Sequence, residues 1–185
     1  MRRLVPFVVL VLAVGFSASA SAKDLTGRVG VGYVSTLPST GALSARYWVT
    51  DSIGIEGDLG FSLFNPKQGD AQNAYALQLG GMYNFVDEPN LHVYGNGNLV
   101  FGSTPVQGVN AAGNPTVTNK TTVGANAGIG MEFFFVGLPN LGWTAGVGIN
   151  VLNTQDVGTT VQLGGSDFAS LGIRYYFGGP KGPPK

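Results

Sequence analysis

The sequence contains no cysteine, and this absence excludes disulfide frameworks, thiolate metal sites and thiol catalysis together. Charge is also scarce, because Lys, Arg, Asp and Glu make up 11% of the chain, against about 25% in ordinary globular proteins. A surface that faces water usually carries more charge than this. Long apolar runs are missing too, since residues 4–16 fall short of the roughly 20 residues that a transmembrane helix needs.

The first 22 residues have the three zones of a secretory signal peptide. Arg2 and Arg3 carry the charge, an apolar run follows, and small residues at 20–22 precede the expected cleavage after Ala22. Of the ten Lys and Arg residues, the mature chain keeps eight against ten acidic residues, a formal net charge of −2. This balance provides no basic excess for nucleic acid.

Alternation at period two recurs along the whole mature chain, whereas a sustained helical period is almost absent. Residues 71–79 also have helical propensity, but their continuation into GGMYNF favours a strand. We therefore predict an all-β fold, a closed antiparallel up-and-down transmembrane barrel over residues 23–177, followed by a disordered tail at 178–185. Its eight strands are expected at residues 25–34, 42–50, 53–63, 73–85, 91–102, 121–135, 141–152 and 166–177.

The connections between these strands alternate in length. Three are short turns rich in Asp, Pro, Asn and Gly, at residues 50–52, 86–90 and 136–140. The others are mostly longer, at residues 35–41, 64–72, 103–120 and 153–165. This asymmetry is typical of outer-membrane barrels and predicts periplasmic termini. The last three long loops are candidate sites for a surface partner.

Each predicted strand has one apolar and one polar face. In residues 53–63, for example, Ile55 and Leu59 alternate with Glu56 and Asp58. Charges suit the lumen better than the lipid face, where a Lys or Arg costs about 2–4 kcal/mol at the midplane. We therefore expect a structural charge network in the lumen, made of Arg28, Arg46, Glu56, Asp58, Glu132 and Arg174. A soluble barrel with its apolar face inward has the same alternation, so this pattern alone leaves both arrangements open.

The aromatic residues favour the membrane arrangement, because they gather near the strand ends. One expected interfacial girdle lies near the short turns and consists of Tyr47, Tyr83, Phe85, Phe133, Phe135, Trp143, Tyr175 and Phe177. A second group lies near the long loops and consists of Tyr33, Phe61, Tyr75 and Phe101. Two aromatic rings around an aliphatic band are typical of a protein that crosses a bilayer.

Three segments carry a resemblance to a known family: RYWVTDSIGIEGDLGF at 46–61, NLHVYGNGNLVFG at 90–102 and LGIRYYF at 171–177. With these segments the chain resembles the small eight-stranded outer-membrane barrels typified by the transmembrane domain of outer membrane protein A and by outer membrane protein X. The resemblance implies an outer-membrane location in a Gram-negative cell. It also implies that Phe177 is the terminal aromatic read by the barrel insertion machinery.

Candidate chemistry is sparse. His92, the one histidine, is either a catalytic base of a lipid-modifying barrel enzyme or a polar residue of the lumen, and its parity favours the lumen. The six charged residues could line an ion path, and inward glycines such as Gly30, Gly54 and Gly80 leave volume for water. An eight-stranded barrel is only just filled by side chains, which favours a plugged lumen. No catalytic residue, metal site or cofactor is assigned.

The sequence thus predicts a non-enzymatic integral outer-membrane barrel with a structural or surface-interaction role. Its expected partners are outer-membrane lipids, lipopolysaccharide and, during biogenesis, the insertion machinery. The first alternative is a narrow, porin-like passive pore for small solutes. A lipid-modifying barrel enzyme and a soluble periplasmic lipocalin-like binder are the remaining alternatives.

Overall fold

The computed structural model describes residues 23–37, 40–64, 72–109, 113–163 and 170–178. The signal peptide at 1–22 and nearly all of the tail at 178–185 therefore lie outside the described residues. No helix in these ranges is long and apolar enough to cross a membrane. The described ranges form nine strands: β1 (Arg28–Leu37), β2 (Thr40–Trp48), β3 (Ile53–Phe64), β4 (Gln72–Glu88), β5 (Leu91–Val109), β6 (Pro115–Phe134), β7 (Leu141–Thr154), β8 (Gly158–Leu163) and β9 (Ser170–Gly178).

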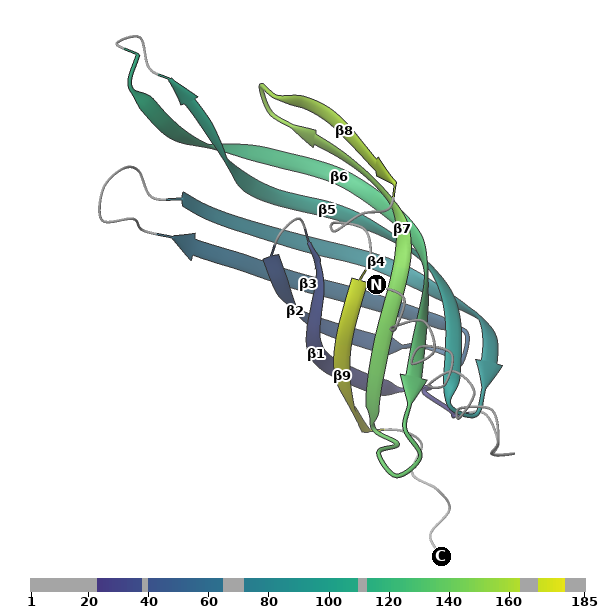
Figure 1. Ribbon diagram of the computed structural model, residues 1–185. Helices are drawn as coiled ribbons and strands as arrows, with labels where there is room; N and C mark the ends of the chain where they lie inside the picture. The colour runs from purple at the N-terminus through teal and green to yellow at the C-terminus, as the bar shows by residue number, and fades with distance from the viewer. Residues whose placement is uncertain (1–22, 38–39, 65–71, 110–112, 164–169, 179–185) are drawn as a thin grey trace, which may run out of the picture.

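The nine strands occupy eight positions of a closed barrel (Figure 1). Consecutive strands from β1 to β7 pair antiparallel, and β9 pairs with both β1 and β7 to close the sheet. Strand β8 pairs with residues 149–154 of β7, whereas β9 pairs with residues 141–146 of the same strand. Because β8 and β9 lie along one edge of β7, they share the eighth position. The closed antiparallel eight-stranded barrel predicted from the sequence is confirmed.

The two ends of the barrel differ, as Figure 1 shows. Short turns join β2 to β3, β4 to β5 and β6 to β7 at one end. Pairing of Arg28 with Gly178 places the start of β1 and the end of β9 at that same end. In the first turn, Thr50 Oγ1 accepts hydrogen bonds from the backbone N–H groups of Ser52 and Ile53, at 3.2 and 2.9 Å. The second turn is tighter than expected, because β4 continues to Glu88 and leaves only residues 89–90 between the strands.

At the other end the prediction of long loops was wrong in three places. Strands β5 and β6 stay in register up to the pair Val109–Pro115, so most of 103–120 is a hairpin rather than a loop. Residues 153–165 contain the end of β7 and all of β8. Both segments are polar but rich in Thr and Val, and paired strands whose two faces meet water need no apolar alternation. Residues 35–41 contain the end of β1 and the start of β2, so only residues 38–39 separate these two strands. Residues 65–71 of the second predicted long loop, and 166–169 of the predicted last strand, lie outside the described residues.

The first strand starts later than predicted, at Arg28 instead of residue 25. Gly27 has a positive φ of 71°, which turns the chain sharply just before the strand. The Gly27 N–H donates to the Trp48 carbonyl at 2.8 Å, and the Arg28 N–H donates to the Leu25 carbonyl at 2.9 Å. As a result Leu25 leaves the outward face that alternation assigns to it and points into the barrel, where it is 1% exposed.

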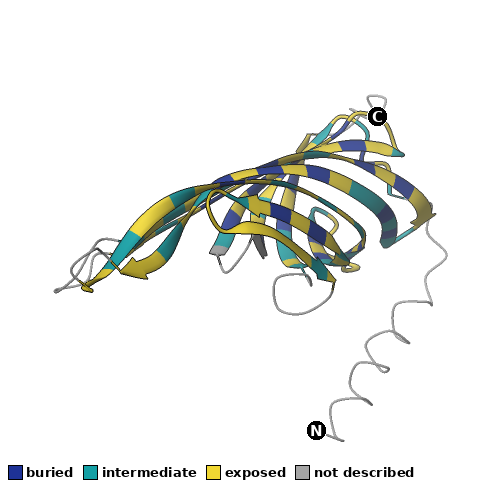
Figure 2. Ribbon diagram, turned by 90° about the horizontal axis from the view of Figure 1, so that it is seen from above, coloured by how far each residue is buried: buried dark blue, intermediate teal, exposed yellow. Residues whose placement is uncertain are grey.

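Burial alternates along every strand around the middle of the barrel (Figure 2). Ile55, Leu59 and Ile129 are 54%, 49% and 56% exposed, whereas Arg46 and Glu132 are 2% and 0% exposed. The outside is therefore apolar and the inside is ionic. A lipocalin-like binder requires the opposite arrangement, with an apolar interior, so that alternative does not fit this structure.

Candidate functional site in the lumen

The interior of the barrel, here called the lumen, holds a compact charged cluster contributed by strands that are far apart in sequence. Arg46 on β2 forms an ion pair with Glu56 on β3 (Nη2–Oε2, 2.5 Å) and another with Glu132 on β6 (Nη1–Oε2, 3.0 Å). Its Nη2 also donates to the Tyr94 hydroxyl at 3.0 Å. One guanidinium group thus joins three strands across the lumen, in the forked geometry that arginine provides.

Arg174 on β9 extends the cluster around the barrel. Its Nη2 lies 2.9 Å from Glu56 Oε2, so that one carboxylate oxygen receives both arginines. The remaining donors of Arg174 reach the hydroxyls of Ser44 at 2.8 and 3.0 Å and of Thr144 at 3.2 Å. The Tyr176 hydroxyl donates to Glu132 at 2.8 Å. Buried charges are stable only when paired and hydrogen-bonded, and these four meet that condition.

Asp58 lies one rung further along β3 and has a different environment. Its Oδ2 accepts a hydrogen bond from Gln78 Nε2 at 3.1 Å. Gln78 Oε1 accepts from Asn126 Nδ2 at 2.7 Å, and Asn126 Oδ1 accepts from Asn98 Nδ2 at 2.7 Å. This amide chain of Gln78, Asn126 and Asn98 spans three strands above the charged cluster.

The structure therefore brings together four of the six residues expected in the lumenal network: Arg46, Glu56, Glu132 and Arg174. Asp58 is buried beside them without an ion pair in the described part of the lumen. Arg28 stands apart. It is half-buried at the short-turn end, where its Nη1 donates to Asn140 Oδ1 at 3.0 Å.

An apolar layer closes the short-turn end of the lumen below the charges. It consists of Leu25, Trp48, Met82, Tyr94, Phe134 and Tyr176, each at most 5% exposed. Most of these side chains lie at positions that alternation assigns to the polar face of their strands, so the sequence does not reveal them as an apolar group. The signal available was Trp48, an apolar residue on a polar face.

Lys23 lies directly on this layer, with Nζ 3.6 Å from the centroid of the Phe134 ring. Burial and then the charge of Arg28 lower the pKa of Lys23 to about 8, while Glu132 acts in the opposite direction. A cation over an aromatic face is stabilised by the ring quadrupole. Residues 23–27 thus cover this end of the lumen, and this segment is here called the stopper.

His92 is also part of this end of the lumen and is 1% exposed. Its Nδ1 lies 2.8 Å from Asp87 Oδ1, and its ring packs edge-on against Phe134 with centroids 5.7 Å apart. Neither its polar nor its ring contacts in the described residues include a serine. The arrangement matches a polar residue that fixes the turn from β4 to β5.

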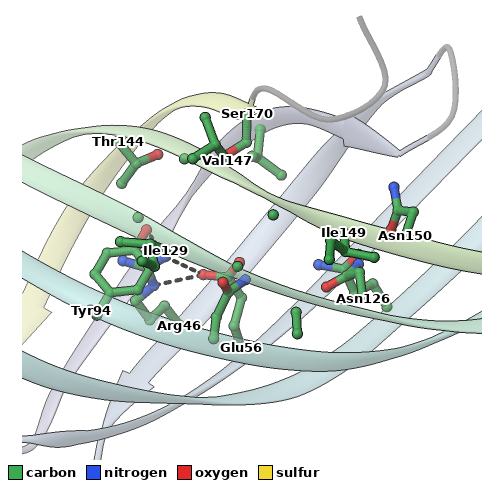
Figure 3. A pocket seen from close by; sticks show the side chains of 18 of the residues that line it. Arg46, Glu56, Tyr94, Asn126, Ile129, Thr144, Val147, Ile149, Asn150 and Ser170 are labelled. Carbon is green, nitrogen blue, oxygen red and sulfur yellow. Dashed lines mark hydrogen bonds and ion pairs between the residues drawn. The ribbon is translucent and has the colours of Figure 1, made fainter. Parts of the chain in front are cut away.

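A cavity of about 60 Å³ borders the charged cluster on the side of the long hairpins (Figure 3). Arg46, Glu56 and Tyr94 line one part of it, and Asn126 and Asn150 line another. This volume is large enough for a few water molecules. Within the described residues, no group of three or more His, Cys, Asp or Glu is arranged to hold a metal ion.

The sequence suggested that the inward glycines leave open volume in the lumen, but other side chains fill most of that volume. The Tyr176 ring covers Gly30, Met82 and Trp48 cover Gly54, and Asn98 covers Gly80. Gly128 and Gly148, which pair with each other, line the cavity together with Gly130 and Gly146. Large side chains of one strand thus fill the space left by glycines of the next.

Gly130 gives a direct test of this packing. A Cβ at Gly130 would lie 2.6 Å from the Tyr94 ring, whereas a Cβ at outward Gly97 has no atom within 4 Å. We expect Gly130→Val to lower the free energy of unfolding by about 1–3 kcal/mol through overpacking, and Gly97→Val to have little effect. Denaturant unfolding of both variants measures this. Equal losses at the two positions would show that backbone conformation, not packing, selects glycine here.

The aromatic residues of the expected girdles lie on the outer surface. Phe133 is half-buried because it packs edge-on against Phe135, with centroids 5.0 Å apart. The ring centroids of Phe135 and Trp143 are 6.3 Å apart, and those of Tyr175 and Phe177 are 4.9 Å apart. The other outward aromatics are exposed: Tyr47, Tyr83 and Phe85 near the short turns, and Tyr33, Phe61, Tyr75 and Phe101 towards the long hairpins.

The exterior of this barrel is apolar and its lumen is filled by paired charges. These two features place the protein in the class of closed β-barrels whose polar side chains face inward. No protein-family model and no curated protein sequence matches this chain. Among solved structures, the chain is similar to the N-terminal β-barrel domain of OprF from Pseudomonas aeruginosa, with 17% identity and a TM-score of 0.54. The match covers 84% of this chain and 100% of that domain.

A second similar structure is the outer membrane protein Ail of Yersinia pestis in a phospholipid bilayer nanodisc. It has 14% identity and a TM-score of 0.42, and the match covers 85% of this chain and 100% of Ail. The likeness to the OprF domain is a likeness of fold. At that level the resemblance to the small outer-membrane barrels, stated from the sequence, is confirmed.

Proposed function

We propose that this protein is an integral outer-membrane barrel with a structural or surface-interaction role and no catalytic activity. The observation that carries the proposal is the reversed polarity of the barrel, with aliphatic side chains outside and paired charges inside. An apolar exterior of this extent is unfavourable in water and suits the hydrocarbon of a bilayer. The outward aromatics at both ends suit its two interfaces.

The proposal includes an orientation. The short turns and both ends of the barrel domain face the periplasm, and the hairpins formed by β5–β6 and β7–β8 project from the cell surface. These hairpins are the surfaces for a partner or for lipopolysaccharide. Phe177, which is exposed at the end of β9, is the terminal aromatic residue that the insertion machinery recognises.

A narrow pore is the second candidate, because the cavity beside Arg46 and Glu56 gives it some support. Two features oppose conduction. The charged cluster spans the lumen from β2 to β6, and the apolar layer with its stopper closes the short-turn end. A solute crossing the barrel would have to displace both.

Fractionation and conductance together test the proposal. The mature protein should remain with the outer membrane until detergent is added, and its migration on gels should change on boiling. In planar bilayers it should give no reproducible single-channel steps. Release in the osmotic-shock fluid would contradict the membrane location, and regular conductance steps would favour the pore.

A further inference from the structure

Two buried carboxyl groups meet in the lumen. Glu56 and Asp58 are alternate residues of β3, so their side chains lie on the same face of that strand. The side chain of Glu56 is 8% exposed, and Asp58 is 1% exposed. The two side chains are within hydrogen-bond reach of each other. A carboxylate only accepts hydrogen bonds, so a hydrogen bond between these two groups requires a proton on one of them.

The arginines of the lumen pair with the other carboxylates and leave Asp58 without a partner of opposite charge. Arg46 forms ion pairs with Glu56 and Glu132, and Arg174 forms one with Glu56. No ion pair reaches Asp58 in the described part of the lumen, and its strongest charge interaction is the repulsion from Glu56. A buried carboxylate without a cationic partner is very costly. Of the three acids in this cluster, Asp58 therefore gains most from being neutral.

The hydrogen bonds around Asp58 fit a neutral carboxylic acid. Charged and hydrogen-bonding groups face it from four strands: Ser44 and Arg46 on β2, Glu56 on β3, Gln78 on β4 and Arg174 on β9. Asp58 Oδ2 accepts from Gln78 Nε2 at 3.1 Å, whereas Asp58 Oδ1 is buried without a hydrogen-bond partner among the described residues. In a carboxylic acid one oxygen accepts as a carbonyl and the other donates as a hydroxyl. Oδ2 fits the first role and Oδ1 fits the second.

We propose that Glu56 and Asp58 share one proton at neutral pH, with Asp58 as a neutral carboxylic acid that donates to the Glu56 carboxylate. Two carboxyl groups in contact do not ionise together, because each negative charge disfavours the other. With this proton in place, Glu56 and Glu132 balance Arg46 and Arg174. The cavity beside Glu56 gives the proton a route to water. The pair is thus a proton-binding site of the lumen, whether or not the barrel lies in a membrane.

Such a site makes the stability of the barrel fall as the pH rises. In the unfolded chain an aspartate loses its proton near its ordinary pKa of about 4. Folding at neutral pH therefore takes up one proton, and the folding equilibrium constant should fall roughly tenfold for each pH unit. The fall begins just above the unfolded pKa and ends where the folded pair loses its proton.

Asp58→Asn isolates this effect, because an amide reproduces the neutral acid and needs no proton. Its Oδ1 can accept from Gln78, and its Nδ2 can donate to Glu56. The ratio of its folding constant to that of wild type should rise roughly tenfold per pH unit between about pH 5 and 7. Asp51→Asn removes an exposed turn carboxylate, and its ratio to wild type should stay nearly constant. Urea unfolding of the mature chain in phospholipid vesicles measures both ratios.

Infrared spectroscopy tests the proton directly and needs no variant that folds. Folded wild type at neutral pH should show the C=O stretching band of a protonated carboxyl group, and the band should disappear on unfolding. Ionisation of every carboxyl group in the folded barrel at neutral pH would overturn the proposal. A band that persists in folded Asp58→Asn would overturn it too, as would a folding ratio for this variant that does not change with pH.

Discussion

Arg46→Leu should lower the free energy of unfolding by about 3–5 kcal/mol, because it leaves buried carboxylates without their partner. The Arg46 guanidinium lies between Glu56 and Glu132 and also binds Tyr94. Without it, Glu132 keeps, among the described residues, only the hydrogen bonds from the Tyr176 hydroxyl, and Glu56 keeps Arg174. Urea unfolding of the barrel in phospholipid vesicles measures the loss.

Two further variants separate charge from geometry in this cluster. Arg46→Lys keeps the charge and loses the fork, so its loss should be smaller. Adding Glu132→Gln to Arg46→Leu removes one orphaned carboxylate and should recover part of the stability, with a coupling energy of about 0.5–3 kcal/mol. A double variant that is as unstable as the sum of the single ones would show that Arg46 acts through packing alone.

The alternation of the sequence is enough to predict which face of each strand these side chains occupy. Arg46 and Glu132 are 86 positions apart, yet period two assigns both to the polar face, and both are buried in the lumen. The outward orientation of Ile55 and Ile129 follows from the same rule. Face assignment is reliable here because a one-residue slip would expose every charge to the outside.

Depth and pairing, in contrast, cannot be derived from alternation. Arg28 and Arg46 have the same parity, but only the register between strands places Arg46 opposite Glu56 and leaves Arg28 at the rim. The same limit applies to Trp48, an apolar residue that lies on the polar face of its strand. Its role became visible only when β4, β6 and β9 placed Met82, Phe134 and Tyr176 at its level.

The hairpins beyond the barrel show a second limit. Residues 103–120 have the composition of a loop, but β5 and β6 continue their ladder through Thr104, Val106 and Gly108. Pairing already established in the barrel extends at little cost in loop-closure entropy, since each new pair follows directly from the last. The polar composition of these segments therefore indicates where the chain leaves the apolar belt, the band of outward aliphatic side chains around the barrel. It does not indicate where the strands end.

The location of the apolar belt in a bilayer can be tested with one charge. Leu59, near the middle of β3, is 49% exposed, and Val109, at the end of the projecting part of β5, is 74% exposed. In hydrocarbon, Leu59→Arg should lower the free energy of unfolding by about 2–4 kcal/mol. Val109→Arg, in water, should change it by less than about 0.5 kcal/mol. Unfolding from phospholipid vesicles measures both. If the surface around Leu59 faced water instead, an arginine would be tolerated equally at the two positions, and equal values would rule out the membrane assignment on which the proposed function rests.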